Sequence, residues 1–400
     1  MKVYLVGIGM EGRNTLTQEA ADAIHKADVL IGAERMLAPF RALGKPVFCG
    51  HRAEEIAAYL NNSDASSAAV LLSGDVGFFS GARKLRDLLS NHQLTILNGI
   101  ASPVYFSGKI GIPWESMKFI SLHGLDNNIA IHVRQNPYCF FLLGGSMTAA
   151  KVCRLLCDYG MPDIKVQTGE NLGYPEEHIM TGTAHDFLDC QTGSLCVLVT
   201  ENPDPCQTLR FVVPDEEFYD ASVKEHVPIT KTEVRTLAVA SLEVSRNSIC
   251  WDIGSGTGSV SVELAQRCPD GAVYSVDKQE AAYRLTKRNA QKFGCDHIHA
   301  FQGSAPEILT DFPMPDKVFI GGSAGNLKDI LNVVYQKNPS AQIAVTAVTL
   351  ETLENAVHAF DSFAGACSVT QLAVTRTRKA GSYTMLAAQN PVFLIRGTLQ

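Results

Sequence analysis

Short apolar runs alternate with amphipathic stretches along the first half of the chain, which is the pattern of strands followed by helices. Residues 15–26, between the first two runs, have the spacing of a helix. The early runs predict strands at 2–6, 29–31, 69–72 and 94–97, and a second series predicts strands near Phe119 and at 139–143, 164–167 and 195–200. This half of the chain is therefore predicted to have α/β architecture.

Prolines and acidic residues interrupt this pattern between residues 201 and 228. Proline disfavours helices and central strands alike. The prolines of this stretch are Pro203, Pro205, Pro214 and Pro228. We therefore predict a domain boundary near residue 210, with one domain over residues 1–205 and another over residues 211–400.

The alternation restarts beyond the break. Helices are predicted at 231–244, 259–268 and 279–293 and from Glu351 onward. Strands are predicted at 248–253, 273–276, 298–301, 317–320 and 342–346, with two late strands around 368–375 and 384–395. These elements form five strand–helix units that end in a pair of strands, so the second half is also predicted to be α/β.

Composition narrows the class of protein. An apolar fraction of 46% with a charged fraction of 19% is enough to build hydrophobic cores, which excludes general disorder. No apolar run reaches the roughly 18 residues that span a bilayer. The early run 3–6 ends at Gly7, which makes it too short for the core of a signal peptide. We expect a cytoplasmic protein that binds no membrane.

The charged residues and the cysteines exclude further classes. With 34 Lys and Arg against 41 Asp and Glu, the formal net charge is −7, and a nucleic-acid partner is not expected without a basic excess. The eleven cysteines are an odd number and contain no Cys-x-x-Cys pair, which disfavours a secreted disulfide framework. Cys153 and Cys157 stand four apart and are predicted to be core residues, so no metal site is expected.

A glycine-rich loop in the second half follows an apolar strand and opens an amphipathic helix. Glycine lets the backbone approach a ligand closely, and the helix N-terminus offers free N–H groups to an anion. A dinucleotide fingerprint would place a third glycine where this chain has Ser259. The pattern Asp-x-Gly-x-Gly-x-Gly instead resembles S-adenosylmethionine binding in class I methyltransferases. The candidate loop residues are Gly254, Ser255, Gly256, Thr257 and Gly258.

The next strand ends support this interpretation. Asp277 closes the second strand, where an acid can accept hydrogen bonds from both ribose hydroxyls. Gly303 and Ala305 follow the third strand, where class I methyltransferases contact adenine. Gly322 and Ser323 follow the fourth strand and are candidates for substrate contact, because open α/β sheets bind ligands at the carboxyl ends of their strands.

Three glycine turns follow strands of the first half. The first contains Gly7, Gly9 and Gly12 with the dinucleotide spacing, but no acid closes the next strand, so a nicotinamide site is not supported. The other two turns are Ser-Gly-Asp-Val-Gly-Phe-Phe at 73–79 and Asn-Gly-Ile-Ala-Ser at 98–102. All three could line one crevice, and their candidate cofactor residues are Gly7, Gly9, Gly74, Asp75, Gly99 and Ser102.

The motifs of both halves resemble known families. The two later turns of the first half resemble the loops of the tetrapyrrole methylases, and Ser-Leu-His-Gly at 121–124 resembles the branch that acts late in corrin synthesis. The second half is similar to a Rossmann-like class I methyltransferase partner, which also implies a cofactor contact at Thr230. Joined in this order, the halves resemble the fused, decarboxylating precorrin methyltransferases of cobalamin biosynthesis.

The resemblance implies a reaction and a fold. The fold would be a tetrapyrrole methylase domain of two α/β subdomains, followed by a Rossmann-like domain. The first domain would methylate carbon 5 of precorrin-6B or its cobalt form, and the second would methylate carbon 15. The second domain would also remove the ring-C acetate carboxyl, which gives precorrin-8x. S-adenosylmethionine would be the only cofactor, and we single out no catalytic acid or base.

The substrate carboxylates require cations. Arg376, Arg378 and Lys379 are predicted to lie in a late turn that overhangs the second site, and His123 could hydrogen-bond a substrate in the first. A solvated basic loop and a structural histidine are the alternatives. An RNA methyltransferase and a non-enzymatic sensor of S-adenosylmethionine also remain possible from the sequence, and a homo-oligomer, dimeric or tetrameric, is expected.

Overall fold

The computed structural model describes residues 1–123, 127–206, 212–219, 227–363 and 365–400. The predicted boundary near residue 210 lies outside these residues. The chain forms two compact units and passes between them more than once. The first unit comprises residues 1–126, 137–154 and 163–203, and the second comprises residues 127–136, 155–162 and 204–400.

The first unit begins with a parallel five-stranded sheet of order β3-β2-β4-β1-β5. Its strands are β1 (Lys2–Gly7), β2 (Val29–Gly32), β3 (Val47–Cys49), β4 (Ser67–Leu72) and β5 (Gln93–Leu97). Its helices are α1 (Gln18–Lys26), α2 (Glu34–Leu37), α3 (Ala53–Asn61) and α4 (Ala82–Leu88), with a 3-10 turn at Ala38–Leu43.

Two predictions for this sheet need correction. The helix expected over residues 15–26 begins only at Gln18, because the side chain of Thr17 accepts a hydrogen bond from the N–H of Ala20 (3.2 Å) and so caps the first turn. Strand β3 was missed. It has only three residues, two of them exposed, so it lacks the apolar run that predicts a buried strand.

The second sheet of this unit is mixed, with the order β6-β7-β10-β8-β9. Strands β6 and β7 run parallel, and the other neighbours are antiparallel. The strands are β6 (Met117–Ser121), β7 (Tyr138–Leu142), β8 (Lys165–Glu170), β9 (His178–Thr183) and β10 (Cys196–Glu201). The helices of this stretch are α5 (Ser102–Ile110), α6 (Ala130–Gln135) and α7 (Ala149–Asp158), with 3-10 turns at Trp114–Ser116 and His185–Phe187. The exposed edge strand β9 was not predicted, since its sequence has no apolar alternation.

The second unit contains a seven-stranded sheet of order β13-β12-β11-β14-β15-β19-β16, parallel except at β19. The strands are β11 (Ile249–Ile253), β12 (Ala272–Asp277), β13 (Ile298–Gln302), β14 (Lys317–Ile320), β15 (Gln342–Ala347), β16 (Cys367–Leu372) and β19 (Val392–Gly397). The helices are α8 (Thr232–Ser241), α9 (Ser259–Arg267), α10 (Glu280–Lys292), α11 (Leu327–Lys337) and α12 (Leu350–Asp361), with 3-10 turns at Asp215–Glu217 and Glu307–Asp311. This is the predicted Rossmann-like α/β domain.

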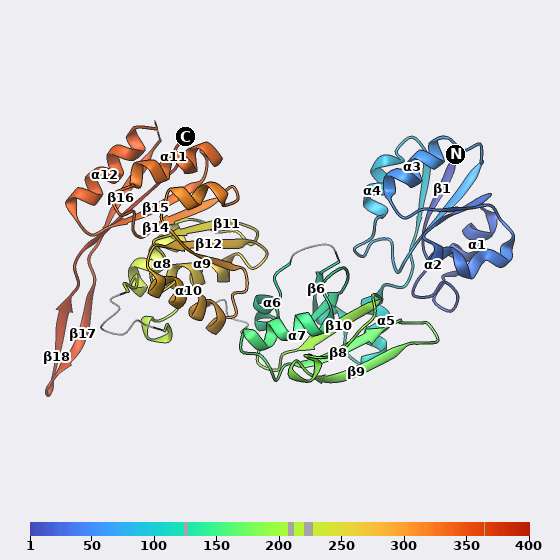
Figure 1. Ribbon diagram of the computed structural model, residues 1–400, viewed down its shortest axis with the longest axis horizontal. Helices are drawn as coiled ribbons and strands as arrows, with labels where there is room; N and C mark the ends of the chain where they lie inside the picture. Colours follow the sequence, from blue (N-terminus) through green and yellow to red (C-terminus); the bar gives the residue numbers. More distant parts are fainter. Residues whose placement is uncertain (124–126, 207–211, 220–226, 364) are drawn as a thin grey trace. The chain divides into compact units, whose positions relative to one another are not determined.

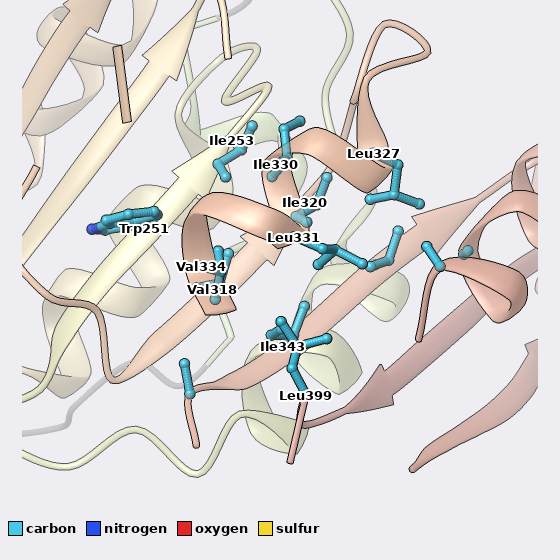
Figure 2. Packing of buried hydrophobic residues seen from close by; sticks show 14 of the residues in the cluster. Trp251, Ile253, Val318, Ile320, Leu327, Ile330, Leu331, Val334, Ile343 and Leu399 are labelled. Carbon is cyan, nitrogen blue, oxygen red and sulfur yellow. The ribbon is translucent and has the colours of Figure 1, made fainter. Parts of the chain in front are cut away.

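Alternate residues of the central strands supply cores on both faces of this sheet, as the twofold strand period requires. Trp251, Val318 and Ile343 pack with residues of α11 and α12 (Figure 2). Their neighbours Cys250 and Phe319 instead pack with residues of α8 and α9. Both faces are therefore covered by helices, which leaves the loops at the strand ends as the accessible part of the sheet.

The end of the chain differs from the prediction. Four strands stand where two were expected, because β17 (Thr375–Ala380) and β18 (Tyr383–Ala388) form a separate antiparallel ribbon. The ribbon projects away from the seven-stranded sheet (Figure 1). Arg376, Arg378 and Lys379 lie in β17, so their placement in a turn was wrong. Strand β17 ends at Ala380, directly before the glycine of the turn, Gly381, which has a φ of +64°.

Candidate cofactor and substrate sites

The three glycine turns of the first unit meet at the carboxyl ends of β1, β4 and β5. Gly9 and Gly74 exchange backbone hydrogen bonds of 3.1 and 2.8 Å. A Cβ on Gly99 would lie 2.2 Å from the carbonyl oxygen of Gly74, and one on Gly7 would lie 2.7 Å from the backbone nitrogen of Gly99. Only glycine fits these positions, so the three turns pack against one another at this edge of the sheet.

Asp75 holds two of these turns together. Its Oδ1 accepts a hydrogen bond from the N–H of Gly77 (2.7 Å), and its Oδ2 accepts one from the N–H of Gly99 (3.1 Å). Each carboxylate oxygen has a second lone pair, so Asp75 keeps acceptor capacity for a ligand. Ser102 is the first residue of α5, where unpaired helical N–H groups lie.

A pocket of about 310 Å³, here called the N-terminal pocket, opens on these turns. Gly74, Asp75, Ser102 and His123 line it. Gly7, Gly9 and Gly99 do not, and act through the backbone packing of the turns. His123 is exposed, and its ring lies against Gly144, where a Cβ would be 2.0 Å from the ring Nδ1.

Sequence reasoning missed several residues of the N-terminal pocket. Arg35 lines it and donates a hydrogen bond from Nη1 to the hydroxyl of Tyr174 (2.9 Å). Met10 and Phe78 supply apolar lining. Arg35 lies in the short helix α2 and belongs to no motif, so only the fold shows that it lines the pocket at the glycine turns.

The glycine loop of the second unit has the backbone that its sequence requires. Gly254, Gly256 and Gly258 have φ values of +75°, +56° and +77°, which favour glycine. A Cβ on Gly256 would lie 2.4 Å from the carbonyl oxygen of Pro228. That carbonyl also accepts a hydrogen bond from the N–H of Thr257 (3.3 Å). The loop therefore packs against the segment that enters α8.

Asp277 holds this loop by accepting backbone hydrogen bonds, as Asp75 does in the glycine turns of the first unit. Its Oδ2 accepts a hydrogen bond from the N–H of Gly256 (3.0 Å), and its Oδ1 accepts one from the N–H of Gln279 (2.9 Å). The carboxylate keeps one lone pair on each oxygen for a ligand. The predicted acid thus also has a structural contact with the loop.

A second pocket, about 360 Å³ and here called the C-terminal pocket, lies along these strand ends. The predicted residues that line it are Gly254, Asp277, Gly303, Ala305, Gly322 and Ser323. The other predicted residues lie outside its lining. Ser255 and Thr257 are buried, and the hydroxyl of Ser255 is 3.2 Å from that of Thr286.

Asp252 lies beneath the loop and is fully buried. Removal from water raises its pKa to about 7, although the hydroxyl of Ser261 donates a hydrogen bond to its Oδ2 and opposes the shift. The neighbouring charge of Asp277 also raises this pKa. Burial therefore favours the protonated form of this acid beneath the loop.

Arg235 on α8 links the segment that enters α8 to helix α9, and it is fully buried. Its Nε donates to Glu263 (2.7 Å), and its Nη1 donates to Asp215 (3.1 Å) and to the carbonyl of Thr230 (2.5 Å). Thr230 therefore takes part through its backbone and does not line the C-terminal pocket. Sequence reasoning did not single out Arg235, because buried arginines are rare and no local pattern marks them.

The predicted substrate cations differ in their surroundings. Arg376 pairs with Asp215 (3.0 Å) and Glu233 (2.5 Å), and these hydrogen bonds raise the pKa of its guanidinium. Its charge is therefore balanced within the protein. Arg378 is exposed, and Lys379 donates to the hydroxyl of Thr384 across the ribbon (2.9 Å).

Neither a metal cluster nor a membrane span is found in the parts of the chain that the structure describes. No group of three His, Cys, Asp or Glu residues there is placed to hold a metal ion. No described helix is long and apolar enough to cross a membrane. None of the eleven cysteines, all of which the structure describes, forms a disulfide.

Fold and glycine loops together define two methyltransferase modules on one chain, and the family models agree. Residues 2–188 match the model of tetrapyrrole (corrin/porphyrin) methylases, and residues 222–398 match that of the precorrin methyltransferase domain. A probable cobalt-precorrin-6B C(15)-methyltransferase (decarboxylating) from Pyrobaculum calidifontis is 42% identical over 185 residues, which cover 46% of this chain and 93% of the relative. The chain belongs to the precorrin methyltransferases, the expected family.

Solved structures give similar partial matches. A precorrin-6y C5,15-methyltransferase from Geobacter metallireducens is 33% identical, with a TM-score of 0.44. The match covers 46% of this chain and 97% of that chain. A precorrin 8W decarboxylase from Methanobacterium thermoautotrophicum is 36% identical, with a TM-score of 0.44, and the match covers 46% of this chain and 98% of that chain.

Proposed function

We propose that this chain is a bifunctional, S-adenosylmethionine-dependent methyltransferase and decarboxylase of cobalamin biosynthesis. Residues 1–205 methylate carbon 5 of precorrin-6B or its cobalt form. Residues 211–400 methylate carbon 15 and remove the ring-C acetate carboxyl, giving precorrin-8x. The observation that carries this proposal is the presence of two separate glycine-loop pockets, one in each unit, on a chain of this family.

Both pockets suit a nucleoside cofactor. The left-handed glycines of the C-terminal loop bring backbone atoms close to a ligand, and Gly322 faces open space, because a Cβ there would meet nothing within 4 Å. Asp277 offers the free lone pairs that two ribose hydroxyls need. In the N-terminal pocket, Asp75 and Ser102 stand in corresponding places at strand and helix ends. Bound S-adenosylmethionine would supply an already activated methyl group to each site.

The residues of this chain would then contribute to catalysis by positioning the macrocycle against the methyl group, more than by acid–base chemistry. A meso carbon of the reduced macrocycle is nucleophilic, because the ring nitrogens donate electron density to it. Holding this carbon in line with the methyl group contributes roughly 7–11 kcal/mol to lowering the barrier. Apolar residues such as Met10 and Phe78 exclude water from the N-terminal pocket. This accounts for the lack of a conspicuous catalytic acid or base.

Loss of carbon dioxide from the acetate requires the protein to do more than position the substrate. The bond between the carboxylate and its methylene carbon breaks, and its electron pair flows into the conjugated ring. A proton then replaces the carboxyl group. Removing the carboxylate from water favours this step. Lys278 is the cation among the residues that line the C-terminal pocket, and it lies there with polar residues such as Ser323 and Asn326.

Turnover of S-adenosylmethionine tests the proposal. The purified chain should form S-adenosylhomocysteine when precorrin-6B is present and should form none with tRNA or without an acceptor. Turnover with tRNA alone would favour the RNA methyltransferase alternative. Binding without turnover for any acceptor would favour the sensor alternative.

We further propose a homo-oligomer, dimeric or tetrameric, that works in the cytoplasm on a small-molecule substrate. The β17–β18 ribbon supports the oligomer. A two-stranded ribbon is marginal in water by itself, and Tyr383 and Leu386 on β18 are each 76% exposed. Leu386→Glu should lower the molar mass measured by light scattering. A monomeric wild-type chain would contradict the oligomer.

A further inference from the structure

A second depression lies beside the N-terminal pocket and involves residues outside every predicted site. It has a volume of about 490 Å³ and shares Asp75 and Phe79 with the N-terminal pocket. Helix α4 and the edge strand β5 contribute Arg83, Arg86 and Ile96 to its lining. We call it the rim pocket. Because two residues line both spaces, the rim pocket adjoins the N-terminal pocket.

Phe79 has an unusual backbone in this position. Its φ is +44°, in the left-handed region that side chains other than glycine avoid at a cost of about 1–2 kcal/mol. The ring is 52% exposed. The preceding Phe78 packs inward, with ring centroids 5.5 Å from Phe119 and 6.0 Å from Phe140. The left-handed residue therefore turns one of two consecutive aromatic rings outward, and such strain is concentrated at functional sites.

The rim pocket combines exposed apolar side chains with cations that form no ion pair among the described residues. Ile96 is 46% exposed and lines the pocket together with Phe79. Arg83 and Arg86 are three residues apart on α4, so they share a helix face. Lys84 between them pairs with Glu54, whereas neither arginine has an ion-pair partner in the part of the chain that the structure describes. Two guanidinium groups are thus available beside an exposed aromatic ring.

Asp75 is the one acid among the residues that line the rim pocket, and its carboxylate oxygens accept hydrogen bonds from the N–H groups of Gly77 and Gly99. Among the described residues no ion pair joins Asp75 to either arginine. Two arginines against one acid give the pocket a net positive charge for a ligand. Guanidinium groups bind carboxylates through paired hydrogen bonds, and an aromatic ring packs against a flat conjugated face.

We propose that the rim pocket is a substrate site of the first unit, where Arg83 and Arg86 bind acetate or propionate carboxylates of the macrocycle and Phe79 packs against its ring face. This inference rests on the proposed function, since it assumes a tetrapyrrole polycarboxylate as substrate. It assigns the specificity for acidic side chains to α4, which holds none of the glycine motifs.

Kinetics of the full chain test the assignment. In Arg83→Gln and Arg86→Gln, the KM of carbon-5 methylation for precorrin-6B should rise about tenfold each, as for the loss of one charge-assisted hydrogen bond. The kcat and the carbon-15 and decarboxylation reactions should stay unchanged. Lys84→Gln is the matched control, because it removes the same charge from the same helix but outside the pocket. Its KM should equal that of the wild type.

Phe79→Gly provides a second, independent test. Glycine accepts a φ of +44° without strain, so the melting temperature should not fall, while the KM should rise severalfold because the ring is lost. Wild-type KM in both arginine variants and in Phe79→Gly would overturn the rim-pocket assignment and leave the proposed function intact. A wild-type chain that forms no carbon-5 product would overturn both together.

Discussion

Asp277 is the residue whose removal should separate the two cofactor sites most cleanly. In the structure its carboxylate accepts backbone hydrogen bonds from Gly256 and Gln279, and it lines the C-terminal pocket. Asp277→Ala removes these contacts and also the acceptors proposed for two ribose hydroxyls. The variant should therefore lose cofactor affinity at this site alone.

The magnitude follows from the number of contacts. Each charge-assisted hydrogen bond to a ribose hydroxyl contributes about 1.5–3 kcal/mol, so two contribute about 3–6 kcal/mol. This corresponds to a loss of affinity of at least about a hundredfold. The loop contacts add to the loss, because Gly256 is no longer held. Asp277→Asn keeps one acceptor oxygen and should fall between the wild type and Asp277→Ala.

Calorimetric titration of the full chain with S-adenosylmethionine is the assay. The wild type should show two classes of sites, and Asp277→Ala should lose one of them. Asp75→Ala is the reciprocal variant, since Asp75 braces the turns of the N-terminal pocket in the same way. It should lose the other class. Two unchanged classes in Asp277→Ala would refute the assignment of this acid.

Three further substitutions test the second unit, and the free energy of unfolding of each variant is measured. Arg235→Met should lower the free energy of unfolding by about 3–5 kcal/mol, because it removes the buried guanidinium 2.7 Å from the carboxylate of Glu263 and leaves the more distant Arg267, at 3.8 Å, as the cation; a loss below about 1 kcal/mol would contradict this. Gly256→Ala should cost about 2–4 kcal/mol, from the left-handed φ and the contact with the Pro228 carbonyl. Gly322→Ala is its control, and should keep stability but weaken cofactor binding. Burial raises the pKa of Asp252 to about 7, so the folded protein favours the protonated carboxyl. The resulting stabilisation is complete below about pH 4 and disappears as the pH rises through about 7. Asp252→Asn should abolish that fall, which is on the order of 4 kcal/mol for three pKa units, and an unchanged pH profile would contradict the assignment.

The central strands of the five-stranded parallel sheet and of the seven-stranded sheet could be predicted from the sequence because they are buried on both faces. Such strands form continuous apolar runs, and β1, β4, β11 and β14 each lie within a residue or two of their predicted bounds. The exposed elements could not be predicted in this way. Strand β3 has only three residues, and the alternating polar residues of β17 carry no apolar run. The strand predicted over residues 384–395 is divided in the structure into β18 and β19.

The residues of the candidate sites also divide into those that could be predicted from the sequence and those that could not. Glycines such as Gly99 and Gly256 are forced by backbone contacts, so their spacing is visible in the sequence. The roles of Arg35, Arg83 and Arg235 depend on which elements the fold brings together, and no local pattern marks them. The predicted turn around Arg376 failed for a related reason, since the sequence does not show where a ribbon leaves its sheet.

The central claim is that one chain carries two methylating sites and one decarboxylating site. Mass spectrometry of the macrocycle tests it most directly, after the full chain has acted on precorrin-6B with S-adenosylmethionine labelled in its methyl group. The account predicts a product with two labelled methyl groups and one carboxyl group fewer than the substrate. A product that carries a single labelled methyl group, or that retains every carboxyl group, would contradict it.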